Sequence, residues 1–79
     1  MEKKLAVITG ADGGMGTEIT RAVASAGYRV IMACCNLVRA AEKRNLLMAE
    51  TGNADIEVQF IDLASLASVA SFARKMVER

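Results

Sequence analysis

The chain has 79 residues, enough for one small domain, and its ten basic and nine acidic residues give a formal net charge of +1. That balance excludes charge-driven binding to nucleic acid or to an anionic membrane, and the absence of histidine excludes imidazole catalysis and histidine-ligated metals. No apolar run approaches the roughly 20 residues that a membrane-spanning helix needs. We therefore expect neither a nucleic-acid partner nor a membrane partner.

Alternating apolar runs and helical patterns follow one another along the chain. Three apolar or β-branched runs predict strands, at residues 5–9, 30–34 and 56–61. The first two runs are almost continuously apolar, as in parallel strands covered on both faces, and the third alternates, as in an edge strand. Apolar residues at steps of three and four predict a helix after each strand, over residues 15–26, 37–48 and 66–77. This order predicts an α/β fold with a parallel sheet and right-handed crossovers.

Residues with capping chemistry stand at the ends of these predicted helices. Asn36 and Ser65 precede the second and third helices, where their side chains are suited to accept a backbone N–H hydrogen bond. Gly27 and Gly52 follow the first and second helices, where a left-handed residue commonly ends a helix. Both kinds of signal support the predicted helix boundaries.

The sharpest feature is the glycine-rich segment 9–16, Thr-Gly-Ala-Asp-Gly-Gly-Met-Gly, between the first predicted strand and helix. Gly10 permits a tight turn, Gly14 lets backbone approach a phosphate, and Gly16 permits close packing of the helix against the strand. The helix N-terminus would face an anion with free N–H groups. A turn that binds nothing is the alternative, and the absence of a Lys-Ser/Thr pair disfavours a P-loop. The candidate cofactor contacts in this segment are Gly10, Asp12, Gly14, Met15 and Gly16.

The end of the second strand bears on the choice of nucleotide. In nucleotide-binding sheets, an acid about 20 residues after the glycine turn suits the ribose 2′-OH of NAD, and a base suits the 2′-phosphate of NADP. Cys34, Cys35 and Asn36 occupy this place, and none is acidic. Arg39 either reaches in from the next helix or is a solvated cation, while Asp12 would repel an added phosphate. The cofactor is NADP or NAD, with a slight preference for NADP, and Cys35 and Asn36 are further candidate contacts.

The glycine spacing, Gly-x-x-x-Gly-x-Gly after Thr9, resembles the short-chain dehydrogenase/reductase family. The resemblance continues through residues 33–36 and through residues 62–69, which look like the retinol dehydrogenase and protochlorophyllide reductase branches. It covers essentially the whole chain. It implies a partial, three-layer Rossmann-like fold with three parallel strands in the order 3-2-1 and three helices. The implied function is the N-terminal dinucleotide-binding part of an NAD(P)-dependent oxidoreductase acting on an alcohol or ketone.

The resemblance also implies residue roles. Asp62 would accept a hydrogen bond from the adenine amino group and Leu63 would offer a backbone N–H. From the residues alone, Asp62 is equally suited to cap the following helix or to face its dipole. Family members that use NADP often carry Arg where Cys35 stands, so that indication of NADP is missing here.

Catalytic residues of the family are not found in this sequence. The resemblance predicts a fourth strand, then Asn-Asn-Ala-Gly, a catalytic Ser and a Tyr-x-x-x-Lys pair. Tyr28 does not fit, because Met32 stands where that lysine would be, and we predict a structural role for it. We expect residues 1–79 to be a partial NAD(P)-binding domain, truncated before the fourth strand and without catalytic activity of its own.

Two other interpretations remain open. Without a fourth strand, the first strand would have an exposed edge, which predicts self-association and a stand-alone nucleotide-binding or self-associating module. The remaining interpretation is a small α/β domain that binds no ligand.

A disulfide between adjacent cysteines closes a strained ring, so Cys34 and Cys35 are expected to be reduced thiols of a cytoplasmic protein.

Overall fold

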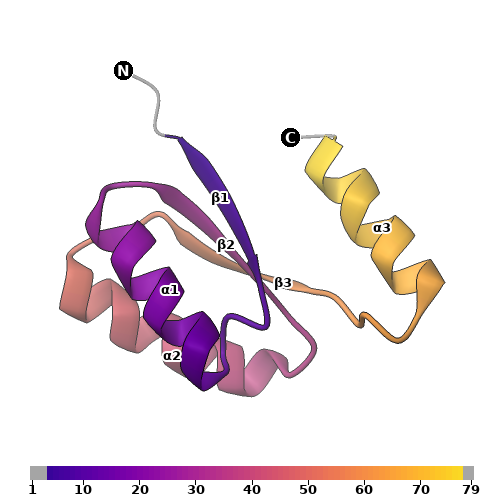
Figure 1. Ribbon diagram of the computed structural model, residues 1–79, viewed down its shortest axis with the longest axis horizontal. Helices are drawn as coiled ribbons and strands as arrows, with labels where there is room; N and C mark the ends of the chain where they lie inside the picture. Colours follow the sequence, from indigo (N-terminus) through magenta and orange to yellow (C-terminus); the bar gives the residue numbers. More distant parts are fainter. Residues whose placement is uncertain (1–3, 78–79) are drawn as a thin grey trace.

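The computed structural model describes residues 4–77, so the outermost residues of the predicted 1–79 domain, 1–3 and 78–79, lie outside the described residues (Figure 1). All six predicted elements are present in the predicted order. They are β1 (Leu5–Thr9), α1 (Gly14–Ser25), β2 (Arg29–Cys34), α2 (Leu37–Thr51), β3 (Ile56–Phe60) and α3 (Leu66–Val77). The third strand ends one residue earlier than predicted, and the second begins one residue earlier.

The sheet is parallel, with β2 between β1 and β3, which confirms the predicted order 3-2-1. Val7 pairs with Ile31, and Ile31 pairs with Glu57, so the three strands are in register across the sheet. Five consecutive residues of β2 are buried, as its continuous apolar run predicted. Because the strands are parallel, their carboxyl ends meet at one edge of the sheet.

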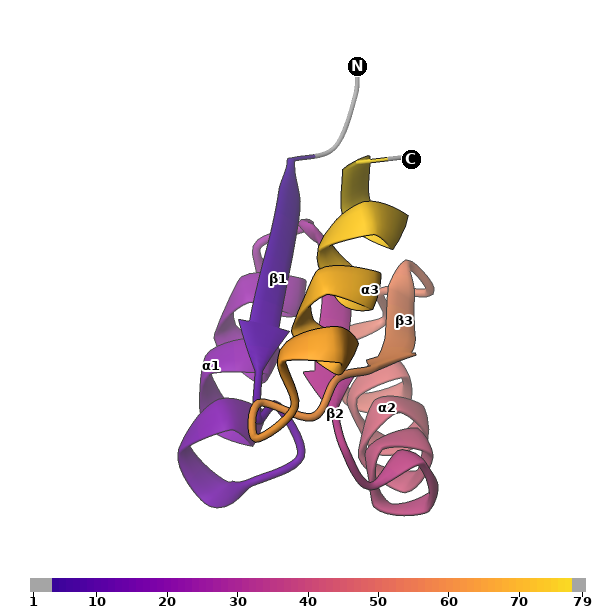
Figure 2. The ribbon, with the colours of Figure 1, turned by 90° about the vertical axis from the view of Figure 1, so that its right-hand side faces the viewer.

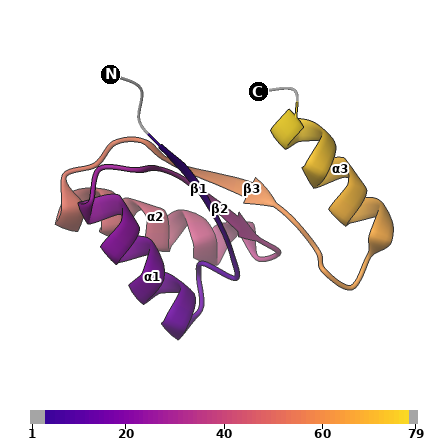
Figure 3. The same cartoon turned by 45° about the horizontal axis from the view of Figure 1, so that its top comes forward.

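Helices cover the two faces of the sheet unequally. Helices α1 and α2 lie together on one face and α3 lies on the other (Figures 2 and 3). On the first face, Val30 and Met32 of the central strand pack in one apolar cluster with Leu47 of α2. On the second face, Ile31 packs in another cluster with Phe72 of α3. The alternation of β2 side chains between the two clusters makes this strand the centre of a three-layer core.

The predicted caps form at the helix ends. The Oδ1 atom of Asn36 accepts a hydrogen bond from the N–H of Arg39 at 3.0 Å, and the Oγ of Ser65 accepts one from the N–H of Ser68 at 3.2 Å. Gly52 ends α2 with φ +72°, a left-handed conformation in which a Cβ would be strained. These local signals explain why the helix boundaries could be predicted.

One polar residue stabilises the opposite end of the sheet. Asn53 is 7% exposed, and its Nδ2 donates to the carbonyls of Ala24 at 3.0 Å and Tyr28 at 2.7 Å. Its Oδ1 accepts a hydrogen bond from the N–H of Asp55 at 2.8 Å. A single side chain thus connects the end of α1 with the starts of β2 and β3.

The outer side of β1 has no strand partner among residues 4–77. Two apolar side chains of this strand, Leu5 and Val7, are 49% and 42% exposed, and the apolar cluster that α3 forms with Ile31 and Ala33 of β2 includes neither of them. Figure 2 shows β1 beside α3 rather than beneath it. No helix in the described part of the chain is long and apolar enough to cross a bilayer.

Candidate functional site

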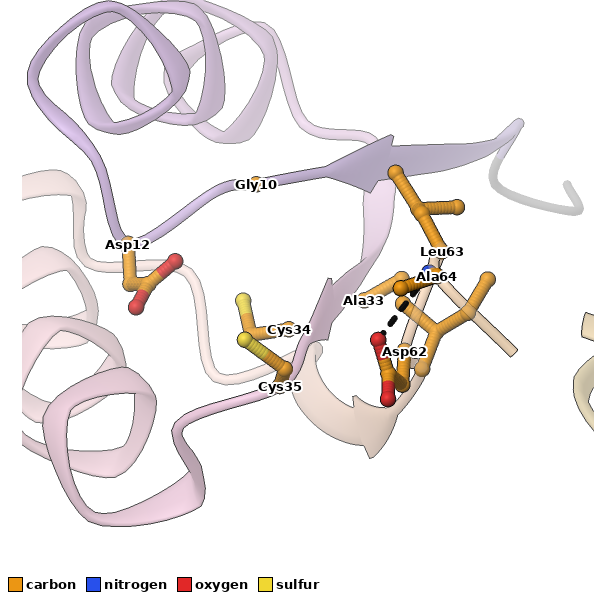
Figure 4. Close-up of a pocket in the computed structure, with 9 residues that line it drawn as sticks. Gly10, Asp12, Ala33, Cys34, Cys35, Asp62, Leu63 and Ala64 are labelled. Carbon is orange, nitrogen blue, oxygen red and sulfur yellow. Dashed lines mark hydrogen bonds between the residues drawn. The ribbon is translucent and has the colours of Figure 1, made fainter. Parts of the chain in front are cut away.

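A cavity of about 240 Å³ opens at the carboxyl edge of the sheet (Figure 4). It is lined by segments that follow all three strands, with residues Gly10, Asp12, Ala33, Cys34, Cys35, Ile61, Asp62, Leu63 and Ala64. Five of the nine predicted contacts are therefore in its wall. The other four do not line it, since Gly14, Met15 and Gly16 form the start of α1 and Asn36 caps α2.

Backbone hydrogen bonds and one steric restriction fix the glycine-rich turn. Gly10 has φ +62°, and its N–H donates to the carbonyl of Ala33 at 3.0 Å, which attaches the turn to β2. The N–H of Gly13 donates back to the carbonyl of Gly10 at 3.1 Å. A Cβ on Gly16 would lie only 2.1 Å from the carbonyl oxygen of Gly10, so only glycine fits at position 16. The close contact is with the turn just after β1, whereas the sequence predicted close packing of the helix on the strand.

A hydrogen bond from the buried side chain of Thr17 also stabilises the glycine-rich turn. The Oγ1 of Thr17 donates a hydrogen bond to the carbonyl of Ala11 at 3.0 Å, and both residues are buried. The contact joins the first turn of α1 to the middle of the glycine-rich segment. Sequence reasoning missed Thr17, because a threonine in an amphipathic helix gives no signal of a bond made six residues back along the chain.

The N-terminus of α1 is open to an anion. Its N-cap residue is Gly13, no side chain caps it, and no acidic residue lies in its first turn. Within residues 4–77, the N–H groups of Gly14, Met15 and Gly16 donate no hydrogen bond to a protein acceptor. A Cβ on Gly14 would meet nothing within 4 Å. The residues therefore fit a phosphate group, which needs free N–H donors, positive dipole potential and space.

An ion pair lies across the cavity wall. The Nε of Arg39 on α2 is 3.7 Å from Oδ2 of Asp12 in the glycine-rich turn. The Arg39 side chain is 55% exposed and that of Asp12 only 15%. Sequence analysis left open whether Arg39 reaches the site, and this contact brings its guanidinium there. The charge on Asp12, expected to repel phosphate, is thus partly compensated.

The adjacent cysteines differ in environment and both are free thiols. Cys34 is 2% exposed and packs under α1 and α2. Burial raises the pKa of the Cys34 thiol, and the nearby Asp12 carboxylate adds to this shift, whereas backbone N–H groups of Asp12 and Ala11 oppose it. Cys35 is exposed and lines the cavity, where Figure 4 shows its side chain between Asp12 and the segment after β3.

Asp62 does not cap α3, because Ser65 does so. Its Oδ1 accepts a hydrogen bond from the N–H of Ala64 at 3.0 Å, and its own N–H donates to Oγ of Ser68 at 2.8 Å. The Oδ2 atom of Asp62 and the N–H of Leu63 have no hydrogen-bond partner among the described residues. The structure therefore argues against the capping role of Asp62, and leaves one acceptor and one donor on adjacent residues that line the cavity.

Four of the residues that line the cavity have ionisable side chains, Asp12, Cys34, Cys35 and Asp62, and Tyr28 is not among the lining residues. Tyr28 lies just before β2, at the sheet end opposite the cavity, and packs against the core under α1 and α2. No group of three or more potential metal ligands occurs within residues 4–77. The residues that line the cavity include neither a phenol nor an imidazole.

Comparisons with known proteins agree with this arrangement. Residues 4–79 match the family described as short chain dehydrogenase. WW domain-containing oxidoreductase from Danio rerio is 44% identical over 73 residues, which cover 92% of this chain and 18% of that protein. Retinol dehydrogenase 12 from Homo sapiens is 36% identical over 70 residues, which cover 89% of this chain and 22% of that protein.

Solved structures show the same fold. An alcohol dehydrogenase from the archaeon Thermococcus sibiricus, complexed with 5-hydroxy-NADP, superposes with a TM-score of 0.85 at 36% identity. The match covers 99% of this chain and 33% of that one. The predicted Rossmann-like fold is thereby confirmed, and the chain spans about a third of the solved protein and about a fifth of the curated relatives.

Proposed function

This chain belongs to the short chain dehydrogenase family, and from that premise we propose that its carboxyl edge binds the adenosine and pyrophosphate portion of NADP or NAD. The proposed role is that of the N-terminal dinucleotide-binding part, residues 1–79, of an oxidoreductase. When bound, the cofactor supplies a nicotinamide that accepts or releases hydride. The residues of this chain bind and orient its other half.

The open start of α1 is the observation that carries the proposal. The unpaired N–H groups of Gly14, Met15 and Gly16 would donate to the pyrophosphate oxygens, and the helix dipole would favour their negative charge. Gly10, which has φ +62° and lines the cavity, starts the turn that leads from β1 to these groups. The empty space where a Gly14 side chain would lie supports close approach of the phosphate, because nothing else in the described residues requires glycine there.

The segment after β3 would hold the adenine ring. The free Oδ2 of Asp62 is suited to accept from the exocyclic amino group, and the free N–H of Leu63 is suited to donate to a ring nitrogen. The Oδ1 atom of Asp62 accepts a hydrogen bond from the N–H of Ala64, which fixes the orientation of the carboxylate. Cys35 and Asn36, after β2, would lie on the ribose side.

We favour NADP as the cofactor. No acidic residue follows β2 to accept from a ribose 2′-OH, since Cys35 and Asn36 stand there. Among the similar solved structures, the Thermococcus sibiricus alcohol dehydrogenase was complexed with a derivative of NADP. Calorimetric titration with NADP and NAD separates the two assignments.

Catalysis would need residues that this chain does not provide. Hydride transfer to a carbonyl requires an acid that protonates the developing oxyanion, and the cavity walls contain no such phenol. We propose that the whole oxidoreductase acts on alcohols or ketones with a hydrophobic body, by analogy with the alcohol and retinol dehydrogenases that the chain resembles.

The free thiols of Cys34 and Cys35 support a cytoplasmic location.

The test is the substitution Gly14→Asp. An acid at the first helical position stabilises a helix by about 0.3–1 kcal/mol, so the melting temperature should not fall. The same charge would repel the pyrophosphate, and NADP binding measured by calorimetry should be lost. Ala49→Asp, an exposed site on α2, is the control with the same charge change, and it should bind normally. If Gly14→Asp bound NADP as tightly as the unsubstituted chain does, the proposal would be refuted.

A second candidate function rests on the unpaired edge of β1. Exposed Leu5 and Val7 flank free backbone groups, a combination that favours pairing with another strand. We propose that a second copy of the chain pairs there when no other strand covers the edge. This would make the chain a self-associating nucleotide-binding module, which differs from the first candidate in its oligomeric state and in having no catalytic partner segment.

A further inference from the structure

We propose that Ser68 of α3 is a positioning residue for the base of the dinucleotide: its hydroxyl holds the backbone of Asp62 and thereby sets the preference for a base with an amino group. The inference rests on the proposed dinucleotide-binding function and adds a residue that acts only through Asp62. The observation behind it is the hydrogen bond of 2.8 Å from the N–H of Asp62 to Oγ of Ser68.

The short turn that begins at Asp62 satisfies all but one of its backbone N–H groups. The N–H of Asp62 donates to Ser68, and the N–H of Ala64 donates to Oδ1 of Asp62 at 3.0 Å. The N–H of Ser65 donates to the carbonyl of Asp62, also at 3.0 Å. The N–H of Leu63 is the one without an acceptor in the described part of the chain. Because every one of these bonds involves Asp62, a displacement of its backbone would move the whole turn.

The hydroxyl of Ser68 is not needed to cap α3. Ser65 is the N-cap, since its Oγ accepts a hydrogen bond from the N–H of Ser68 at 3.2 Å. In a capping box, the side chain of the third helical residue would accept from the N–H of the N-cap residue. Here that N–H donates to Asp62 instead, and the hydroxyl of Ser68 bonds to the backbone three residues earlier. The bond therefore stabilises the turn that carries Asp62 rather than the helix end.

Packing of α3 on the sheet fixes the position of Ser68. Phe72 lies one helical turn further along the same face and is buried with Ile31 and Ile61 in one apolar cluster. The N–H of Ile61 donates to a backbone carbonyl of β2 at 3.1 Å. Asp62 is thus held on two sides, by the sheet through the preceding residue and by the helix through Ser68.

A carboxylate fixed in this way distinguishes between bases. The bond from Ala64 orients the carboxylate within the turn (Figure 4), and Ser68 fixes the turn on the protein. The free Oδ2 of Asp62 only accepts, so it would bond to the amino group of adenine and repel the carbonyl oxygen that hypoxanthine has in its place. Because hydrogen bonds weaken steeply when misaligned, this preference depends on a fixed direction.

A matching contact on the other wall of the cavity provides a comparison. Thr17, like Ser68, lies near the start of its helix and bonds through its hydroxyl to the backbone six residues earlier, at Ala11. Ala11 belongs to the glycine-rich segment, which would hold the pyrophosphate. Loss of the Thr17 hydroxyl should therefore weaken binding of a dinucleotide whatever its base.

The first experiment measures, by calorimetry on the intact protein, the dissociation constants of NADP and of its analogue with hypoxanthine in place of adenine. We expect the unsubstituted protein to prefer NADP by at least about 10-fold, as for a hydrogen bond to a charged group. Ser68→Ala should reduce this preference to less than about 3-fold. Ser71→Ala, the same change at an exposed position of α3, should alter neither constant. Thr17→Val should weaken both and keep their ratio.

The ratio of the two constants decides the outcome. A preference that is retained in Ser68→Ala, or lost in Thr17→Val, would overturn the positioning role of Ser68. Equal binding of both dinucleotides by the unsubstituted protein would also overturn it, although dinucleotide binding itself would stand. Failure of the unsubstituted protein to bind either dinucleotide would instead reject the proposed function.

Amide hydrogen exchange tests the same contact without a substitution. In the free protein we expect the N–H of Asp62 to be protected, because it is bonded to Ser68, and the N–H of Leu63 to be unprotected. Addition of NADP should protect the N–H of Leu63. Equal lack of protection of the two amides in the free protein would overturn the proposal, even if Ser68→Ala does not fold.

Discussion

At the scale of single residues, the glycines of segment 9–16 are used for different reasons. Gly10 needs its positive φ, and Gly16 needs the absence of a Cβ because the carbonyl of Gly10 lies against it. Gly14 needs neither, since its backbone is helical and the surrounding space is open. The fold therefore explains glycine at positions 10 and 16, whereas at position 14 only the proposed phosphate contact would call for one.

This difference predicts opposite effects for one substitution at two positions. Gly16→Ala should lower the free energy of unfolding by about 1–3 kcal/mol, because the contacting atoms are backbone and cannot rotate away. Gly14→Ala should be neutral or should stabilise by up to about 1 kcal/mol. Urea denaturation of the two variants measures both values. Equal destabilisation would show that the turn does not pack as described.

At the scale of elements, sequence patterns and structure agree closely. The continuous apolar run of β2, the glycine after α1 and the caps Asn36 and Ser65 are local signals, and each predicts the element that it marks. The same holds for the placement of the site, because parallel strands bring their carboxyl ends together whatever else the chain does. Local pattern and topology therefore account for the six elements and the position of the cavity.

The contacts that sequence could not predict join elements distant in the chain. Asn53 bonds backbone groups 29 and 25 residues away, and the partner of Arg39 lies in another element. Such bonds depend on the three-dimensional distance between elements, which no local periodicity encodes. The sequence supplied candidates for the site, and only the structure shows that Asp12 is compensated and that Asp62 is not a helix cap.

Asn53 provides the prediction at this scale. Asn53→Ala removes partners from two carbonyls and one N–H, and we expect the free energy of unfolding to fall by about 2–4 kcal/mol. Asn45→Ala, exposed on α2, is the control and should change it by less than about 0.5 kcal/mol. Thermal melting followed by circular dichroism makes the comparison. A similar melting temperature for the two variants would contradict the role of Asn53.

At the scale of the whole molecule, helices cover the two faces of the sheet to different extents. Helices α1 and α2 cover one face, while α3 covers only part of the other, and one edge of β1 pairs with no strand among residues 4–77. The strand that leads into the glycine-rich turn thus has two exposed apolar side chains, Leu5 and Val7. The association proposed for β1 and the nucleotide binding proposed beyond its carboxyl end would use different surfaces, so substitutions can test them separately.

A charge on the free strand tests this separation. Val7→Lys places an ammonium group on the exposed side of β1, and we expect self-association of the chain to decrease while nucleotide binding persists. Val38→Lys, at a 73% exposed position on α2, is the control and should leave association unchanged. Sedimentation over a range of protein concentrations measures the assembled fraction. Assembly of Val7→Lys at the same concentration as the unsubstituted chain would rule out the β1 edge.

The cavity wall is assembled from the segments after β1, β2 and β3, so any occupant touches all three strand–helix units at once. Unfolding of any one unit would then release the occupant. By thermodynamic linkage, a ligand present at a hundred times its dissociation constant adds about 2.7 kcal/mol to the stability of the folded state. In so small a sheet, a bound nucleotide would contact all three strand–helix units, and they would then unfold cooperatively.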